Sequence, residues 1–132
     1  DDGQLLGSKH NTEGRIFLNA QTWSVIARTA TPDRARRAMA SMERHLNREY
    51  GPLLLTPAYT RPDRGIGYLS RYAPGTRENG GVYSHAATWA IWAECLMGRG
   101  DEKAALYRCL RQFVATGASP WGQARTRPSG DI

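Results

Sequence analysis

The stretch "YSHAATWAIWAECLM", from Tyr83 to Met97, decides the fold class of this chain. Apolar residues occupy nearly all of its positions, and no glycine or proline interrupts it, which predicts a helix buried on both sides. Its apolar part covers about twelve residues and contains Glu94, whereas a bilayer-spanning helix needs roughly 20 residues. We therefore expect a soluble, cytoplasmic protein with no membrane partner.

Two further helices are predicted upstream of this stretch. In "NAQTWSVIARTA" the apolar Trp23, Ile26 and Ala27 share one helical face, which indicates a helix of about ten residues. The next helix begins with an N-cap at Thr31, followed by Pro32 at the first helical position. We expect that helix to continue to the Gly51-Pro52 pair. Its apolar face consists of Ala35, Ala38, Met39, Met42 and Leu46.

The segment between these helices and Tyr83 contains prolines and glycines that no long helix can include. Residues 53–76 are therefore predicted to form a long irregular crossover, and connections of this length are usually functional or carry short strands. A fourth helix is expected after Asp101, ending at Gly117. Its apolar stripe consists of Leu106, Tyr107, Leu110, Phe113 and Val114.

These elements predict an all-α fold of helical hairpins, with residues 1–116 as the folded part and residues 117–132 as a loose C-terminal tail. The helix from Tyr83 to Met97 is too apolar for three other helices to cover. We therefore expect either self-association into a homo-oligomer or a ring of neighbouring helices beyond this chain. Because the first residue is Asp1 rather than Met, we expect an artificial or processing boundary there.

Composition limits the partners. The net charge of +6 favours anionic partners, but the arginines are spread along the chain and no nucleic-acid motif frames them. A solvated basic surface is the simpler interpretation, so we expect no nucleic-acid partner. Cys95 and Cys109 lie in apolar helical patterns without zinc-ligand spacing, and we expect two buried, reduced thiols and no metal site.

Polar groups gather in "RENGGVYSH", from Arg77 to His85, directly before the apolar helix. A glycine pair among charged and amide side chains predicts a lined pocket, because glycine allows close backbone approach and positive φ. This stretch belongs to the second of three blocks that resemble one enzyme family. The blocks are "GSKHNTEGRIFLNAQTWSVIA" (7–27), "YTRPDRGIGYLSRYAPGTRENGGVYSH" (59–85) and "WAECLMGRGD" (92–101).

The three blocks resemble the inverting cellobiose and chitobiose phosphorylases, which form glycoside hydrolase family 94, formerly glycosyltransferase family 36. The resemblance implies a slice of an (α/α)6 toroid, whose neighbouring helices would cover the apolar helix. It also implies reversible cleavage of a β-glucosidic bond by inorganic phosphate, with inversion, to give an α-sugar 1-phosphate. The substrates would be phosphate and a β-linked glucose or N-acetylglucosamine oligosaccharide, with no cofactor.

The resemblance assigns roles by position in the motif. Glu78 matches a sugar-binding carboxylate, Arg77 stands where relatives often have Lys at a sugar contact, and His85 matches a phosphate-binding histidine. Asn79, Gly80 and Gly81 would shape the pocket. The family's general acid is an Asp N-terminal to the matching region. Its motif is not found in this sequence, where Asp1 and Asp2 stand in another context, so we expect the chain alone to be inactive.

Other residues of the matching blocks have simpler interpretations. Trp23, Trp89 and Trp92 could stack on sugar rings, but their helical spacing favours core packing. Asn11, Glu13, Asn19 and Gln21 are interpreted as loop and cap residues. Two other classes of function stay open from the residues themselves: a small, self-associating helical module for binding or scaffolding, and a basic nucleic-acid binder. The acceptor sugar is not predictable from this sequence.

Overall fold

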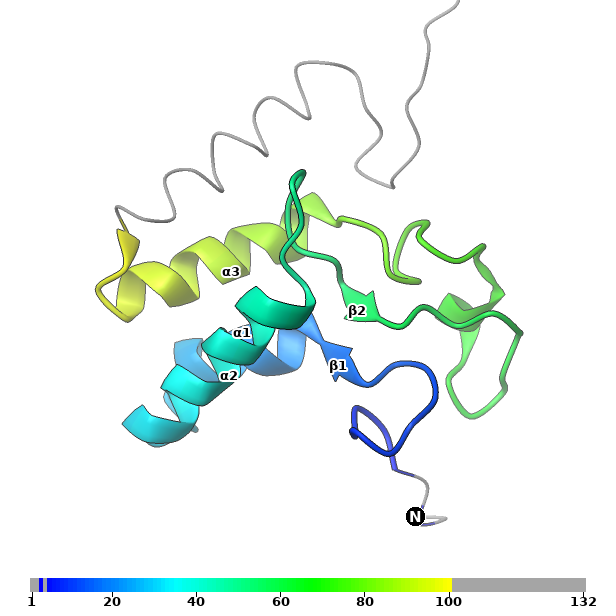
Figure 1. The fold of residues 1–132 in the computed structure, drawn as a ribbon, viewed down its shortest axis with the longest axis horizontal. Helices are drawn as coiled ribbons and strands as arrows, with labels where there is room; N and C mark the ends of the chain where they lie inside the picture. Colours follow the sequence, from blue (N-terminus) through cyan, green and yellow to red (C-terminus); the bar gives the residue numbers. More distant parts are fainter. Residues whose placement is uncertain (1–2, 4, 101–132) are drawn as a thin grey trace, which may run out of the picture.

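The computed structural model describes residue 3 and residues 5–100 of the chain (Figure 1). It is mostly helical within these residues, with α1 (Leu18–Ile26), α2 (Pro32–His45) and α3 (Ser84–Leu96). The strands β1 (Ile16–Phe17) and β2 (Leu55–Thr56) form a small sheet, and a 3-10 helix, η1, covers Tyr68–Arg71. The three predicted helices are confirmed, whereas the all-α prediction missed the sheet.

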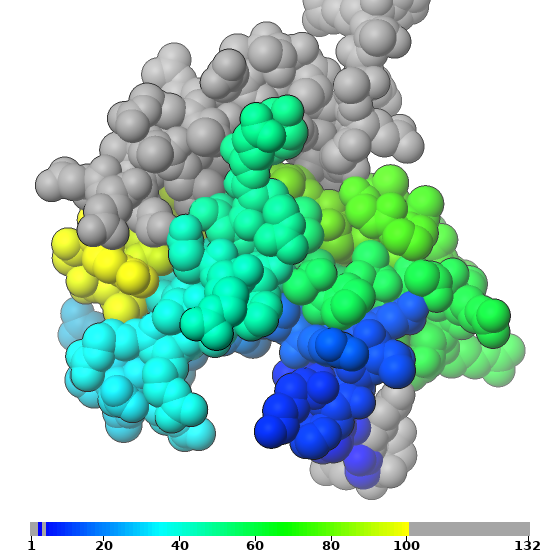
Figure 2. Space-filling view, viewed as in Figure 1, coloured from blue at the N-terminus to red at the C-terminus, as the bar shows by residue number. Residues whose placement is uncertain are grey.

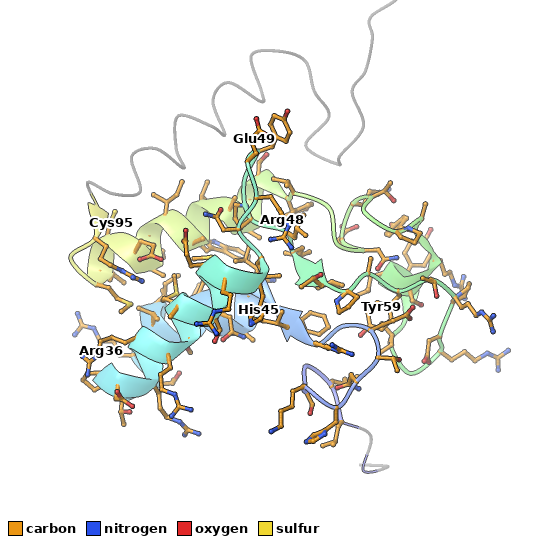
Figure 3. The ribbon with its side chains drawn as sticks, viewed as in Figure 1. Arg36, His45, Arg48, Glu49, Tyr59 and Cys95 are labelled. Atoms are coloured by element: carbon orange, nitrogen blue, oxygen red, sulfur yellow. The ribbon has the colours of Figure 1, made fainter. Side chains whose placement is uncertain are left out.

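The helix α2 begins where its sequence predicts, but it ends earlier than the predicted Gly51-Pro52 pair. The Thr31 hydroxyl accepts a hydrogen bond from the Arg34 backbone N–H at 3.5 Å, and Pro32 occupies the first position. The helix stops at His45 instead of reaching Gly51, because Arg48 and Gly51 exchange two backbone hydrogen bonds of 3.2 and 3.1 Å. That turn reverses the chain and projects from the body, as the loop above α2 in Figure 3 shows.

The core lies where α1 packs against both α2 and α3. From α1 and α2 it receives Leu18, Met39 and Met42, all fully or almost fully buried, as the pattern of α2 predicts. The contribution of α3 is a row of small side chains, which lets another helix come close. These are Ala86, Ala90 and Ala93.

The face of α3 opposite the alanines is open within the described residues. Trp92 is 50% exposed and Leu96 is 47% exposed, and Trp23 of α1 is 41% exposed. The predicted burial of α3 on both sides stays a prediction, because it was expected to require neighbouring helices beyond this chain or a second copy. Core burial of Trp23 and Trp92 is wrong within the described residues. Cys95 is also exposed rather than buried, because it lies off the alanine face (Figure 3).

The small sheet ties the N-terminal block to the long irregular segment. Strand β1 pairs with β2 in antiparallel register, Ile16 with Thr56 and Phe17 with Leu55. Backbone pairing continues from β2 toward the RENGG stretch, since Leu54 N–H donates to Gly81 O at 2.9 Å. The crossover of residues 53–76 therefore does carry short structure, as the length of the segment led us to consider.

The predicted fourth helix after Asp101, Cys109 and the tail from residue 117 lie outside the described residues. Within the described part of the chain, no helix is long and apolar enough to cross a membrane.

Candidate functional site

The stretch that carries the predicted site forms a tight double turn before α3. Gly75 N–H donates to Asn79 O at 2.8 Å, and Asn79 N–H donates to Thr76 O at 3.0 Å. Arg77 has a φ of 48°, which is unusual for a residue with a side chain. Backbone bonds therefore hold Arg77 and Glu78 at the tip of a closed loop.

Asn79 fastens this loop to the rest of the irregular segment. Its side chain is fully buried, and its Oδ1 accepts from Tyr59 N–H at 2.8 Å. The Nδ2 group donates to Tyr59 O and to Tyr72 O, each at 2.8 Å. One amide side chain thus joins three chain segments, and no aliphatic side chain could supply these bonds.

Gly80 and Gly81 allow backbone segments to pack directly on one another. Gly80 has a φ of 80°, and a Cβ there would lie 3.0 Å from the Ala58 Cβ. A Cβ on Gly81 would lie 2.7 Å from Arg77 O, which is closer than real Cβ contacts. Both glycines shape the loop through its own packing, while a direct role in a ligand pocket stays a prediction.

Arg77 and Glu78 lie side by side at the loop tip. Arg77 Nε is 3.5 Å from Glu78 Oε2, and the Arg77 guanidinium carbon lies 4.5 Å from the centre of the Tyr72 ring. The two side chains are 50% and 33% exposed. Glu78 Oε2 is shielded from solvent without a hydrogen-bond partner in the described residues. The carboxylate therefore keeps capacity to accept hydrogen bonds from hydroxyl groups.

His85 lies in the first turn of α3, exposed on one side and packed on the other. Its ring centre is 4.5 Å from that of Trp89 and 6.3 Å from that of Tyr83. Trp23 packs edge-on against Trp89 at 5.3 Å, so α1 supports the ring on which His85 rests. Trp89 is half-buried. His85 is thereby oriented by a row of aromatic rings.

The helix end beside His85 has features that suit an anion. No side chain caps α3, since Tyr83 at the N-cap makes no side-chain cap bond. The neighbouring Ser84 Oγ is shielded from solvent and lacks a partner among the described residues. First-turn N–H groups and the helix dipole both favour negative charge at such an end.

Residues 1–118 match one known protein family, described as the glycosyl hydrolase 94 superfamily, catalytic domain. The chain belongs to this family. The resemblance seen in the three sequence blocks is thus confirmed.

Several named relatives of this family 94 chain are phosphorylases. It is 42% identical over 102 residues to solabiose phosphorylase from Paenibacillus borealis. The aligned region covers 77% of the chain and 13% of that protein. It is 34% identical to N,N'-diacetylchitobiose phosphorylase from Vibrio proteolyticus, covering 85% of the chain and 14% of that protein. Cellobionic acid phosphorylase from Neurospora crassa is 33% identical, with 86% of the chain and 14% of that protein covered. The chain thus spans about one seventh of these relatives.

In this family 94 chain the predicted residues form two separate groups. Arg77, Glu78 and Asn79 belong to the loop, whereas His85 belongs to α3. Within the described residues no hydrogen bond, ion pair or ring contact joins Glu78 to His85. Their roles toward sugar and phosphate stay predictions.

Sequence reasoning missed the supporting residues. Tyr72, which lies against Arg77, and Ser84, beside His85, were not singled out. The same holds for Tyr59, whose hydroxyl pKa is raised by burial and then by the negative charges of Asp63 and Glu13. Only the position of Ser84 next to His85 offered a signal in the sequence.

The loop and cap roles expected of Asn11, Glu13 and Gln21 are supported by their hydrogen bonds, whereas the side chain of Asn19 makes none within the described residues. Asn11 Oδ1 accepts from Ser8 N–H at 2.9 Å, and Glu13 Oε1 accepts from both the N–H and the hydroxyl of Thr60. Gln21 Nε2 donates to Phe17 O at 3.3 Å. The Glu13 bonds tie the N-terminal loop to the irregular segment, while the bonds of Asn11 and Gln21 are local.

Proposed function

We propose that this chain supplies part of the sugar- and phosphate-binding site of an inverting phosphorylase, which cleaves β-glucosidic bonds with inorganic phosphate to give an α-sugar 1-phosphate. Membership of family 94 and relatives named as phosphorylases support the reaction class. The observation that carries the local assignment is the uncapped end of α3 with His85 and Ser84 beside it.

Glu78 is proposed as the sugar-binding carboxylate. Its Oε2 atom lacks a hydrogen bond within the described residues, and the contact with Arg77 Nε at 3.5 Å is too long to be a strong one. A carboxylate accepting from sugar hydroxyls forms charge-assisted bonds, which are stronger than bonds between neutral groups. Arg77 would orient this carboxylate and reach a hydroxyl itself.

His85 is proposed as the phosphate ligand. The packing against Trp89 at 4.5 Å orients the imidazole, which can donate a hydrogen bond to a phosphate oxygen. The first-turn N–H groups of α3 and the Ser84 hydroxyl would add further donors. Phosphate would then take the place that water has in an inverting hydrolase, so a general acid is needed and a general base is not.

Cleavage would require a carboxylic acid that protonates the leaving oxygen, and none of the described residues is assigned that role. We therefore propose that this chain alone is inactive. Incubation with cellobiose and phosphate should release no glucose 1-phosphate above the level of a heat-treated control. Measurable phosphate-dependent release by the purified chain would contradict this proposal.

The two residues should fail differently in a longer enzyme that contains this segment. His85→Ala should mainly raise KM for phosphate, whereas Glu78→Ala should lower kcat/KM for every sugar substrate. Each loss should be about 2–4 kcal/mol if the group acts in the transition state. If both variants kept the kcat/KM of the unaltered enzyme toward phosphate and sugar, the loop and the helix end would have structural roles only.

A second candidate is a self-associating helical module without catalysis. It is favoured by the apolar side chains that α1 and α3 expose together, Trp23, Trp92 and Leu96. Exposed apolar patches above a few hundred Å² usually mark association sites. Light scattering at micromolar concentration should give the mass of a dimer or larger oligomer, and a monomeric mass would exclude this candidate.

A further inference from the structure

A basic groove lies between the N-terminal loop and α2. Neither Glu78 nor His85 lines it. Figure 2 shows it as a hollow between the cyan surface of α2 and the blue surface of the N-terminal residues. Its volume is about 560 Å³. The cationic side chains that line it are Lys9, Arg15, Arg44 and Arg48, joined by the imidazole of His45.

None of the described residues that line the groove carries a carboxylate. The remaining lining residues carry no acidic group, and Gln21, Ser41 and Thr56 contribute polar side chains. Among the described residues, the ion pairs that arginines form involve Arg36, Arg77 and Arg99, none of which lines the groove. The folded chain therefore gathers positive charge that is dispersed along the sequence between residues 9 and 48.

Two of the arginines are already held in place. Arg48 donates to Asn47 O at 2.7 Å and to His45 O at 3.0 Å, so it offsets the negative end of the α2 dipole. Arg15 donates through Nε to Asn11 O at 2.7 Å. That bond orients the Arg15 guanidinium and leaves both of its Nη groups without a hydrogen bond within the described residues.

We propose that this groove is a second anion site, which binds a phosphate group carried by a small molecule. A guanidinium with both Nη groups available matches two oxygens of a phosphate, and Arg44 and Lys9 supply charge from the opposite wall and the loop. The concave shape suits a compact anion better than a flat basic face does. The site does not rest on the proposed role of His85, with which it shares no residue.

The test is an NMR titration of the 15N-labelled chain with inorganic phosphate and, separately, with glucose 1-phosphate. Sodium chloride keeps the ionic strength constant, so that general screening does not change. We expect saturable shifts of the Lys9, Arg15 and Arg44 amides with at least one of the two probes. Arg15→Gln and Arg44→Gln should each weaken this binding by about threefold to tenfold, from the usual range for charged hydrogen bonds and partly exposed ion pairs.

Arg34→Gln is the matched control, because Arg34 is an exposed arginine of α2 outside the groove. It should leave the affinity unchanged, and circular dichroism would verify that all three variants fold. Shifts confined to residues near His85 would overturn the groove site while supporting the proposed function. Shifts that fail to saturate, or that survive both groove substitutions, would also overturn it.

Discussion

Replacing Asn79 tests whether one buried amide holds the loop that carries Arg77 and Glu78. Asn79→Ala removes three hydrogen bonds of 2.8 Å and leaves the N–H and C=O of Tyr59 and the C=O of Tyr72 without their partner. At about 1 kcal/mol for each bond, with an added penalty for buried groups that stay unpaired, the free energy of unfolding should fall by about 3–5 kcal/mol. That is a large part of a typical domain stability of about 5–15 kcal/mol.

Asn79→Asp sharpens this prediction, because it keeps the shape and one acceptor while losing both donors. The buried carboxylate would face the carbonyl oxygens of Tyr59 and Tyr72, so its pKa in the folded state should exceed the unfolded value of about 3.9. The folded state then binds more protons than the unfolded state just above pH 4, and stability falls as pH rises. We expect this variant to be less stable than Asn79→Ala at pH 7 and to recover as pH is lowered toward 4.

Urea denaturation followed by circular dichroism measures both variants, provided that the slope with urea concentration stays that of the original chain. Asn19→Ala is the matched control, since Asn19 is exposed on α1 and its side chain makes no hydrogen bond within the described residues. Its effect should stay within about 0.5 kcal/mol. A loss below about 1 kcal/mol for Asn79→Ala, or one equal to that of the control, would refute the fastening role.

Three further predictions concern the loop, the irregular segment and α3. Gly81→Ala should destabilise the chain by about 1–3 kcal/mol, because the added Cβ would lie 2.7 Å from Arg77 O. In the same denaturation assay the control Gly100→Ala, whose nearest contact is 3.5 Å, should change stability by no more than about 0.5 kcal/mol. Burial, Asp63 and Glu13 raise the pKa of Tyr59, so the free energy of unfolding should decline as pH rises above about 10. Tyr59→Phe should show a smaller decline between about pH 9 and 11, and an equal decline in the variant and the original chain would contradict this. In a longer enzyme containing this segment, Trp89→Leu should raise KM for phosphate and leave KM for sugar unchanged, since it removes the ring 4.5 Å from His85; equal changes in both constants would point to a general loss of structure.

Local patterns in the sequence were sufficient to locate the three described helices and to identify the family, although the predicted end of α2 was too late. The Thr31 cap and the apolar spacing from Ala35 to Leu46 act within one or two helical turns, so α2 begins and buries its face as predicted. The uninterrupted apolar run likewise predicts α3. Family membership also follows from sequence blocks, because their motifs keep the same order along the chain.

Contacts between distant residues required the tertiary structure. The pairing of Ile16 with Thr56 and the bonds of Asn79 to Tyr59 connect residues whose separation gives no periodic signal. The exposure of Cys95 and Trp92 could not be predicted from the sequence either, because a helical pattern does not indicate which sides of the helix have neighbours. Arg15 and Arg44 look like scattered surface charges in the sequence, and only the packing of the N-terminal loop beside α2 brings them into one groove. Hydrogen bonding within a helix is local, whereas the surroundings of a side chain depend on every segment that the fold brings near it.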